Sequence, residues 1–361
     1  MRGRVLLPSL VVALAAVVCG CRHLGPRSIV ADRIPYNEAI ARSWKEQTLL
    51  NIVKLRYADT PFFVDVPQIT SGYTLQGTAT GGGSISPPVN PVASFAQQLG
   101  GSLLFQGAYQ DRPTISYQPQ TGSQFIRNIT TPINPGSVLF LLQSGYPADL
   151  VLELTVDSIN GVRNRNMTGG ELKPADPEFT WLIRTLRKAQ ISGHVGIRVT
   201  REKDGKDSVA FFFQDQNIDP AMKEELAKAR QILKIDPARG EFRVTFGAAA
   251  ANPNEIAILS RSVFRVLSEL ATFVEVPALH QASGIAAPFD SHPEETSPLR
   301  VFSGLKEPCD PFASVFYEGQ WFWIEKSDLR SKRTLAYLLV LLALADTGAK
   351  ENLPVITIQA N

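Results

Sequence analysis

Cysteine is scarce in this 361-residue chain, which holds three, and two of them, Cys19 and Cys21, lie at the end of the N-terminal apolar run. Cys309 is the one cysteine in the rest of the chain, so no disulfide can form within the folded part. A lone thiol in an oxidising compartment is either buried and inert or free to pair with another molecule. We expect Cys309 to be buried.

Histidine and the common catalytic motifs are also scarce. The four histidines are His23, His194, His280 and His292. None has a partner at a metal-binding spacing such as His-Glu-x-x-His. Residues 292–294 and Cys309 partly match a zinc deaminase pattern, but Phe312 stands where the second cysteine would be. A nucleophile elbow and a phosphate loop are both absent. We therefore predict no metal, no cofactor and no catalytic residue.

An excess of positive charge is missing too. The chain has 36 Lys plus Arg against 34 Asp plus Glu, and the first 20 residues hold two of the basic residues, Arg2 and Arg4, and no acid. The remaining chain is therefore neutral, which argues against a nucleic-acid partner, because phosphates require a concentrated basic surface. Hydrophobic residues make up 44% of the sequence, which excludes global disorder and allows one large core or several smaller ones.

The N-terminus carries the clearest targeting signal in the sequence. Arg2 and Arg4 precede an apolar run at residues 5–18, a pattern typical of a secretory signal and too short for a transmembrane helix. The sequence Val18-Cys19-Gly20-Cys21 resembles the bacterial lipobox, in which the cysteine after a small residue and glycine is lipidated. The resemblance implies that residues 1–20 are cleaved and that Cys21 becomes an acylated diacylglycerol-cysteine, carrying for example palmitate. An ordinary signal peptide that contains two cysteines is the alternative.

Lipidation would make the membrane a permanent partner. Each buried methylene contributes about 0.8 kcal/mol, so two or three acyl chains anchor a protein durably where one binds reversibly. Arg22 stands where an Asp would retain a lipoprotein in the inner membrane of Gram-negative bacteria. By this resemblance we expect the periplasmic face of the outer membrane.

The mature chain is predicted to be an α+β protein, with antiparallel hairpins packed against several amphipathic helices and no transmembrane span after the signal peptide. Helices are expected at 36–57, 137–143, 148–159 and 328–345, and strands at 62–66, 68–75, 103–109, 114–117, 195–199, 209–213, 242–246, 312–317, 320–324 and 355–358. Three more helices are expected after Asp176-Pro177, Asp219-Pro220 and Asn252-Pro253, each a capping residue followed by proline. The third of these would continue to residue 274.

Composition divides the chain into successive regions. We expect a signal peptide at 1–20, a lipid-proximal tether at 21–34, a helix plus β-rich segment at 35–120, a central α+β region at 121–275 and a hairpin-helix-strand region at 276–361. The segment 77–101 is rich in Gly, Pro, Ser and Ala, a composition that buries little apolar surface, and is expected to be a flexible loop. A second, polar loop is expected at 281–298.

The densest aromatic feature is the predicted hairpin at 312–324. Trp321 and Trp323 would share one face, and Phe322 and Ile324 the other. Either the hairpin is covered on both faces, or one face is an exposed aromatic patch for a partner, glycan or lipid. The charged stretch 325–333 opens the last helix and is either solvated or a contact for anions. The candidate partner contacts are Tyr317, Trp321, Trp323, Arg330, Lys332 and Arg333.

Three stretches resemble a family of uncharacterised outer-membrane lipoproteins of Gram-negative bacteria. They are Tyr36-Asn37-Glu38-Ala39-Ile40 with residues 50–57, Ser144-Gly145-Tyr146-Pro147-Ala148-Asp149-Leu150 with residues 158–161, and Trp321-Phe322-Trp323-Ile324 with residues 328–334. Together they touch both ends and the middle of the mature chain. The family has no assigned activity, so the resemblance implies an address and no catalytic residue.

Three functions follow as hypotheses. We expect a non-enzymatic, lipid-anchored periplasmic protein that binds or scaffolds an envelope protein partner. The first alternative is a hydrolase of envelope polymers with unrecognised Asp or Glu catalysts, which requires a cleft where two acids of perturbed pKa converge. The second is a carrier of lipid or a small apolar ligand, which requires a deep apolar pocket.

Overall fold

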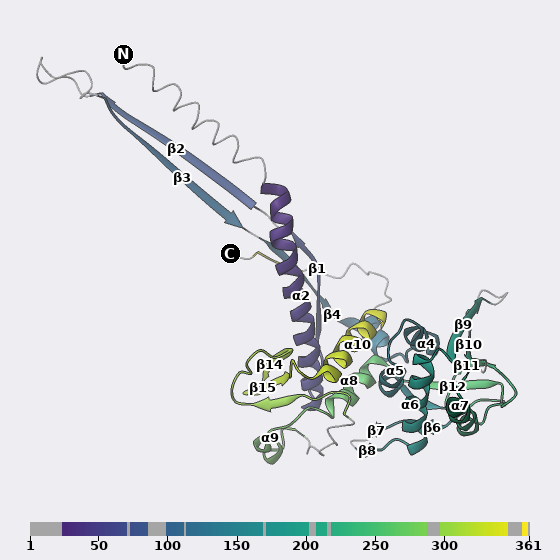
Figure 1. Cartoon of the computed structure of the whole chain (residues 1–361). Coiled ribbons are helices and arrows are strands. Elements are labelled where there is room, and N and C mark those ends of the chain that lie inside the picture. Colours follow the sequence, from purple (N-terminus) through teal and green to yellow (C-terminus); the bar gives the residue numbers. More distant parts are fainter. Residues whose placement is uncertain are drawn as a thin grey trace, which may run out of the picture. The chain divides into compact units, whose positions relative to one another are not determined.

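The computed structural model describes residues 24–70, 73–85, 99–111, 113–168, 171–201, 207–214, 218–286, 297–345 and 356–359 (Figure 1). The predictions for the signal peptide and for Cys21 lie outside these residues. The chain forms two compact units: a larger unit of residues 1–62 and 121–348, and a smaller unit of residues 63–120 and 349–361. The predicted α+β class is confirmed. None of the helices in the described ranges has both the length and the apolar character needed to span a bilayer.

A six-stranded sheet is the centre of the larger unit. Its strand order is β6-β5-β12-β11-β10-β9. The strands are β5 (Val156–Ile159), β6 (Val162–Arg163), β9 (Val195–Arg201), β10 (Asp207–Phe213), β11 (Glu241–Phe246) and β12 (Glu255–Ser260). All neighbours are antiparallel except β11 and β12, which pair in parallel. The predicted hairpin of β9 and β10 is confirmed, with Val195 paired with Phe213 at its open end.

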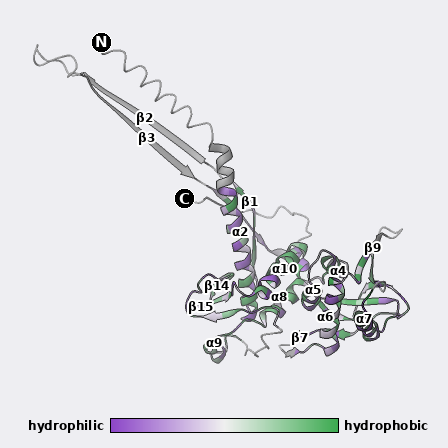
Figure 2. Ribbon diagram, viewed as in Figure 1, coloured by the Kyte–Doolittle hydropathy of each residue, from purple (hydrophilic) through white to green (hydrophobic). Residues whose placement is uncertain are grey.

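Some helices of the larger unit pack against this sheet, and others pack against one another. The helices are α2 (Leu24–Arg56), α3 (Gly122–Thr130), α4 (Pro135–Gln143), α5 (Ala148–Thr155), α6 (Pro177–Ile191), α7 (Pro220–Leu233), α8 (Val263–Ala271), α9 (Ala278–Ala282) and α10 (Leu329–Ala345). Among the described elements, α4 packs against β9, β11 and β12, while α6 packs against β9 and α7. Figure 2 shows hydrophilic and hydrophobic segments side by side on these helices, as expected of amphipathic elements. Phe179, Leu182, Leu226 and Phe242 are among the buried core residues.

The predicted starts of α6 and α7 are confirmed, but the helix expected after Asn252-Pro253 is wrong. Asn252 Oδ1 accepts a hydrogen bond from the Asn254 amide at 2.9 Å and closes a turn. The following residues form β12, and the helix begins only at Val263, where the Ser262 hydroxyl accepts from the Arg265 amide at 3.2 Å. A continuous apolar run fits a buried interior strand as well as a buried helix, which explains the error.

Two further boundaries differ from the expectations. The predicted helix at 148–159 ends at Thr155, and its β-branched continuation pairs with β12 as β5. The described part of α2 already includes Leu24 and continues without a break to Arg56, so the tether expected at 21–34 is wrong for residues 24–34. The second half of α2 is buried as predicted, with Leu49, Ile52 and Val53 fully inaccessible.

A three-stranded sheet, in the order β13-β15-β14, packs beside the end of α2. Its strands are β13 (Phe302–Gly304), β14 (Ala313–Tyr317) and β15 (Gln320–Ile324), and Val274 forms an isolated bridge with Val301 next to it. The predicted hairpin is confirmed. Its turn residues Glu318 and Gly319 both have positive φ, at 47° and 75°, as a two-residue hairpin turn requires. A short hairpin of β7 (Asn166–Thr168) and β8 (Glu171–Lys173) completes the larger unit.

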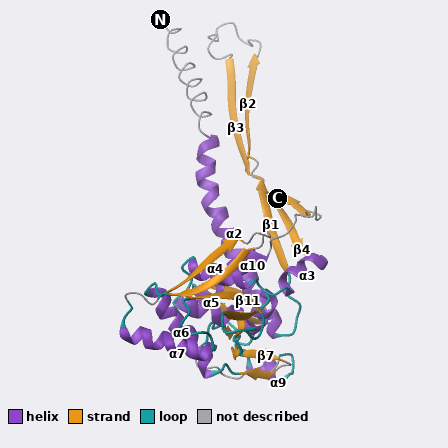
Figure 3. Cartoon of the chain, turned by 90° about the vertical axis from the view of Figure 1, so that its right-hand side faces the viewer, coloured by secondary structure: helices purple, strands orange, loops and turns teal. Residues whose placement is uncertain are grey.

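The smaller unit is made of strands (Figure 3). β1 (Phe63–Thr70), β4 (Thr114–Gln120) and β16 (Ile356–Gln359) form one antiparallel sheet in the order β1-β4-β16, and β2 (Tyr73–Ile85) pairs with β3 (Leu99–Asp111). The flexible loop expected at 77–101 is wrong for its described parts, because residues 77–85 and 99–101 are strand. Ladder hydrogen bonds come from the backbone, so glycines 81–83 pair across the hairpin without needing side chains.

Candidate functional site

An apolar cavity of about 450 Å³ lies between the six-stranded sheet and helices α4, α5 and α6. Most of its lining is aliphatic or aromatic. The lining residues are Leu139, Leu142, Gln143, Gly145, Ala148, Leu152, Ile159, Leu186, Arg187, Gln190, Val195, Gly196, Ile197, Phe211, Phe212, Leu233, Val244, Ile256 and Ile258. The volume falls within the roughly 300–1,000 Å³ of small-molecule pockets.

The cavity has a buried apolar interior and a solvent-exposed mouth. Leu152, Ile159, Leu233 and two neighbours on β12 are no more than 4% exposed and form its interior. Gln143 and Gly145, at the end of α4, are exposed and mark its mouth. A ligand that fits this gradient is apolar over most of its length.

Two glycines set the spacing of the elements around the cavity. A Cβ on Gly136 would lie 3.1 Å from Val209 Cγ2, so its absence lets the start of α4 approach β10. Gly196 pairs with Phe212 across the β9–β10 hairpin, and a Cβ there would lie 2.3 Å from the ring. The Phe212 ring therefore covers the backbone of β9 at the edge of the cavity.

Gln190 on α6 holds the helical wall of the cavity in place. Its Nε2 donates to the carbonyls of Leu142 at 2.7 Å and Tyr146 at 2.8 Å, and its Oε1 accepts from the Ala148 amide at 3.0 Å. One side chain thus supplies hydrogen-bond partners for backbone groups at the end of α4 and at the start of α5, which have no partner within their own helix. The α4–α5 turn is therefore fixed to α6. The wall has a defined geometry before any ligand enters.

Arg187 is the one charged residue in the lining, one turn before Gln190. Its Nη1 donates to Gln190 Oε1 at 2.7 Å, and its Nε lies 3.9 Å from Asp149 Oδ1. The side chain is 33% exposed, so it reaches solvent as well as the lining. The cavity thus has an apolar interior and a guanidinium group at its edge.

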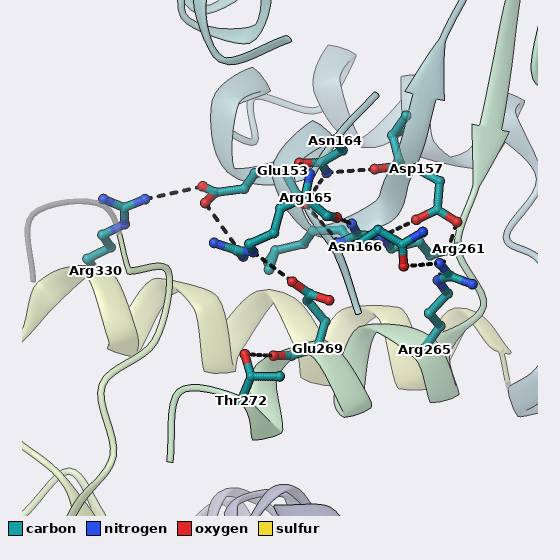
Figure 4. A network of polar contacts seen from close by, with 12 residues as sticks. Glu153, Asp157, Asn164, Arg165, Asn166, Arg261, Arg265, Glu269, Thr272 and Arg330 are labelled. Carbon is teal, nitrogen blue, oxygen red and sulfur yellow. Dashed lines mark hydrogen bonds and ion pairs between the residues drawn. The ribbon is translucent and has the colours of Figure 1, made fainter. Parts of the chain in front are cut away.

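A second polar feature is a buried charge cluster (Figure 4). It consists of Glu153, Asp157, Arg165, Arg261, Arg265, Glu269 and Arg330. Arg261 is 1% exposed; its Nε lies 2.8 Å from Asp157 Oδ1, and its Nη atoms donate to three backbone carbonyls. Arg165 Nε lies 2.6 Å from Glu269 Oε1. Each acid faces a guanidinium, which indicates that the cluster joins α5, β5, α8 and α10.

Glu153 is an acid of this cluster whose carboxyl group is largely buried. Burial raises the pKa of Glu153, although the nearby guanidinium groups of Arg165 and Arg330 lower it. Arg330 Nη2 lies 3.2 Å from the carboxylate and Arg165 lies 4.0 Å away. The carboxyl therefore gives up its proton less readily than an ordinary Glu.

A polar and aromatic group surrounds the end of α2. Tyr57 Oη lies 2.7 Å from His280 Nδ1, and its ring contacts those of Tyr317 and Phe322. Burial raises the pKa of Tyr57 to about 12, and burial with the hydrogen bond to Asp59 raises the pKa of Tyr317 to about 12. The amide of Thr60, followed by Lys54, holds the pKa of Asp59 below its usual range.

A cavity of about 500 Å³ lies beside this group. Its lining includes Leu55, Tyr57, Ser268 and Ile285, and it contains no Asp or Glu. Its last lining residue is Ala286, where one described range ends. The cavity at α4–α6 is the candidate site, because every residue of its lining is described.

The predicted partner contacts do not form one group. Tyr317 donates a hydrogen bond to Asp59 at 3.1 Å, and Arg330 pairs with Glu153, so both have contacts within the chain. Trp321 and Trp323 are half-buried on one face of β15, where Trp323 stacks on Phe302 and Trp321 meets Phe316 edge-on. Phe322 and Ile324 are fully buried on the other face. Lys332 Nζ lies over the Phe312 ring, and Arg333 is exposed. Neither tryptophan is exposed, and a partner contact on this face stays a prediction.

Cys309 is exposed, which contradicts the predicted burial. It lies between Pro308 and Asp310 in the turn-rich connection from β13 to β14. Its small apolar side chain predicts burial on average, but position in a surface connection overrides that preference. Within the described ranges, no group of three or more His, Cys, Asp or Glu side chains could hold a metal ion.

Sequence reasoning did not find the cavity. Its lining residues have the helix and strand periodicities of an ordinary core, so Leu186 or Ile197 looks the same whether it meets another side chain or an empty volume. Gly196 opposite Phe212 and the polar Gln190 on an otherwise apolar helix face were the available signals.

Comparisons with protein-family models, with curated proteins and with solved structures find no match for this chain.

Proposed function

We propose that this chain is a lipid-anchored, non-enzymatic binding protein of the bacterial cell envelope, and that it holds a small apolar ligand in the cavity at α4–α6. The single observation that carries the proposal is the cavity itself, about 450 Å³ with an apolar interior. Apolar side chains that line an open cavity of that size lack the packing contacts that a filled core would provide. A bound ligand restores them, which makes binding the function that the cavity supports best.

The cavity favours binding over hydrolysis. Its lining contains no Asp or Glu, so it offers no carboxylate pair for general acid and base catalysis. The buried acids of the charge cluster are held by arginines, and such a network fits the role of a structural link. These observations support the binding role.

The proposed lipid anchor and the proposed cellular location rest on the sequence alone. Cys21 lies outside the described residues, and the proposal takes its lipidation from the lipobox resemblance. Several acyl chains would hold the protein at the periplasmic face of the outer membrane. A scaffolding role toward an envelope protein stays a prediction, with the half-exposed face of Trp321 and Trp323 as its contact surface.

The proposal is tested by filling the cavity. Leu142 lines it and is half-buried near the mouth, so Leu142→Trp should extend into the volume without disrupting the deep core. Leu305, 79% exposed in the connection after β13, provides the matched control Leu305→Trp. An apolar fluorescent probe should bind wild type and Leu305→Trp with one site per chain, and Leu142→Trp at least tenfold more weakly.

Thermal unfolding of all three proteins establishes that they are folded. Val244→Trp, on the sheet side of the same cavity, gives an independent test from the opposite wall. Probe binding that neither cavity variant weakens, or a folded wild type that binds no apolar probe, would contradict the proposed function.

A further inference from the structure

The polar groups of the cavity are confined to its helical side. Of the nineteen lining residues, those with polar side chains are Gln143, Arg187 and Gln190, on α4 and α6. The sheet side consists of apolar side chains and Gly196. A ligand therefore meets hydrogen-bonding groups at one end only, which is the arrangement that an amphiphile requires.

Arg187 is the group that would meet the polar end of the ligand. A guanidinium has five N–H donors in a planar fork, and the hydrogen bond to Gln190 Oε1 uses one of them. Asp149 Oδ1 is 3.9 Å from Nε, beyond hydrogen-bond distance, and this oxygen is buried although the side chain as a whole is 47% exposed. Among the described contacts, Arg187 therefore keeps donors that an incoming anion could occupy, and a carboxylate matches the fork with two parallel hydrogen bonds.

Gln190 positions this guanidinium. Its amide is already committed to Leu142, Tyr146 and Ala148, so the oxygen that accepts from Arg187 is fixed in space. Arg187 thus approaches the cavity from a rigid wall, which reduces the ordering cost of binding.

The volume of the cavity limits the size of the apolar part of the ligand. At about 450 Å³ the cavity is in the lower part of the range for small-molecule pockets, which suits one unbranched chain rather than a two-chain lipid. Its interior at Leu152, Ile256 and Ile258 has no polar side chain to satisfy.

From these observations we infer that the ligand is a single-chain amphiphile with a carboxylate head, its chain in the cavity and its head on the Arg187 guanidinium. The inference rests on the proposed function and specifies its ligand class. A charge-assisted hydrogen-bond pair should favour the acid over an uncharged analogue by about 10- to 100-fold.

The test compares ligands that differ in the head group alone. The mature full-length chain carries Cys21→Ser, so that no membrane or detergent competes for the ligand. Dodecanoic acid, dodecan-1-ol and dodecyl phosphate each displace a fluorescent apolar probe from the cavity. Wild type should bind dodecanoate at least tenfold more tightly than dodecanol, and dodecyl phosphate no more tightly than dodecanoate.

Arg187→Gln should weaken dodecanoate binding by about 10- to 100-fold and leave dodecanol binding unchanged, which also shows that the cavity is intact. Arg184, exposed on the same helix, provides the matched control Arg184→Gln, which should bind both ligands as wild type does. Equal affinity of wild type for acid and alcohol, or an unchanged Arg187→Gln, would overturn the carboxylate assignment while leaving the apolar site in place.

Tighter binding of dodecyl phosphate would also overturn the carboxylate assignment. Failure of the folded wild type to bind the probe or any of the three ligands would overturn the proposed function itself. The two failures are therefore distinguishable within one set of titrations.

Discussion

Replacing Arg261 with leucine should be among the most destabilising single changes in the larger unit. The side chain is 1% exposed, and Arg261→Leu removes its ion pair with Asp157 at 2.8 Å. The change also removes hydrogen bonds to the carbonyls of Glu153 and Leu154, both at 3.2 Å, and to that of Arg165. The first two acceptors lie at the end of α5, next to β5, and Arg165 lies between β6 and β7, so the loss acts where a helix and a connection meet the central sheet.

The expected magnitude follows from the groups left behind. Breaking a buried ion pair costs about 3–5 kcal/mol, and each buried carbonyl left without a donor costs about 1–3 kcal/mol. These costs do not add fully, because Asp157 still forms an ion pair with Arg265 at 3.3 Å after the substitution. The Asp157 side chain is also 13% exposed, so water can reach it. We expect the free energy of unfolding to fall by about 4 kcal/mol, a large part of the roughly 5–15 kcal/mol of a typical domain.

Urea unfolding followed by circular dichroism measures this change. The matched control is Arg163→Leu, since Arg163 pairs with Asp176 at 3.5 Å while 76% exposed. An exposed pair contributes about 0–1 kcal/mol, so the control should stay within 1 kcal/mol of wild type. A loss for Arg261→Leu as small as that of the control would refute the claim that the charge cluster joins these elements.

Three other outcomes are expected. Glu153→Gln should flatten the pH dependence of stability. Burial raises the pKa of Glu153 in the native state, so the unfolded state releases this proton first, and the free energy of unfolding of the wild type should fall as pH rises above about 4.5. An unchanged slope in the variant would contradict the burial argument. Cys309 should react rapidly with a thiol reagent in the native protein, and protection until unfolding would show that it is covered. Cys21→Ser should move the protein from the membrane fraction to the soluble one, and retention would refute the lipid anchor.

Local signals were reliable where one physical cause dominates. Asp176-Pro177 and Asp219-Pro220 begin helices as predicted, because proline fits the first helical position in both. The same device at Asn252-Pro253 closes a turn, since tertiary pairing with β5 and β11 places the next residues in a strand. Propensity indicates what a segment can form, and the neighbouring strands decide between the possibilities.

Properties that depend on distant residues were beyond the sequence. Arg261 and Asp157 are 104 positions apart, and no local pattern marks them as a pair. The cavity at α4–α6 depends on how α4, α5 and α6 pack against the sheet, and its lining has ordinary core periodicity. The aromatic hairpin could be placed from alternation, but only the packed structure shows which face meets Tyr57.

The most direct test of the central claim is native mass spectrometry of the lipidated protein purified from bacterial membranes. Wild type and Leu305→Trp should each carry one small apolar molecule per chain in addition to the covalent lipid, and Leu142→Trp should not. Identical spectra for wild type and Leu142→Trp, with both proteins folded, would contradict the account of the cavity as a binding site.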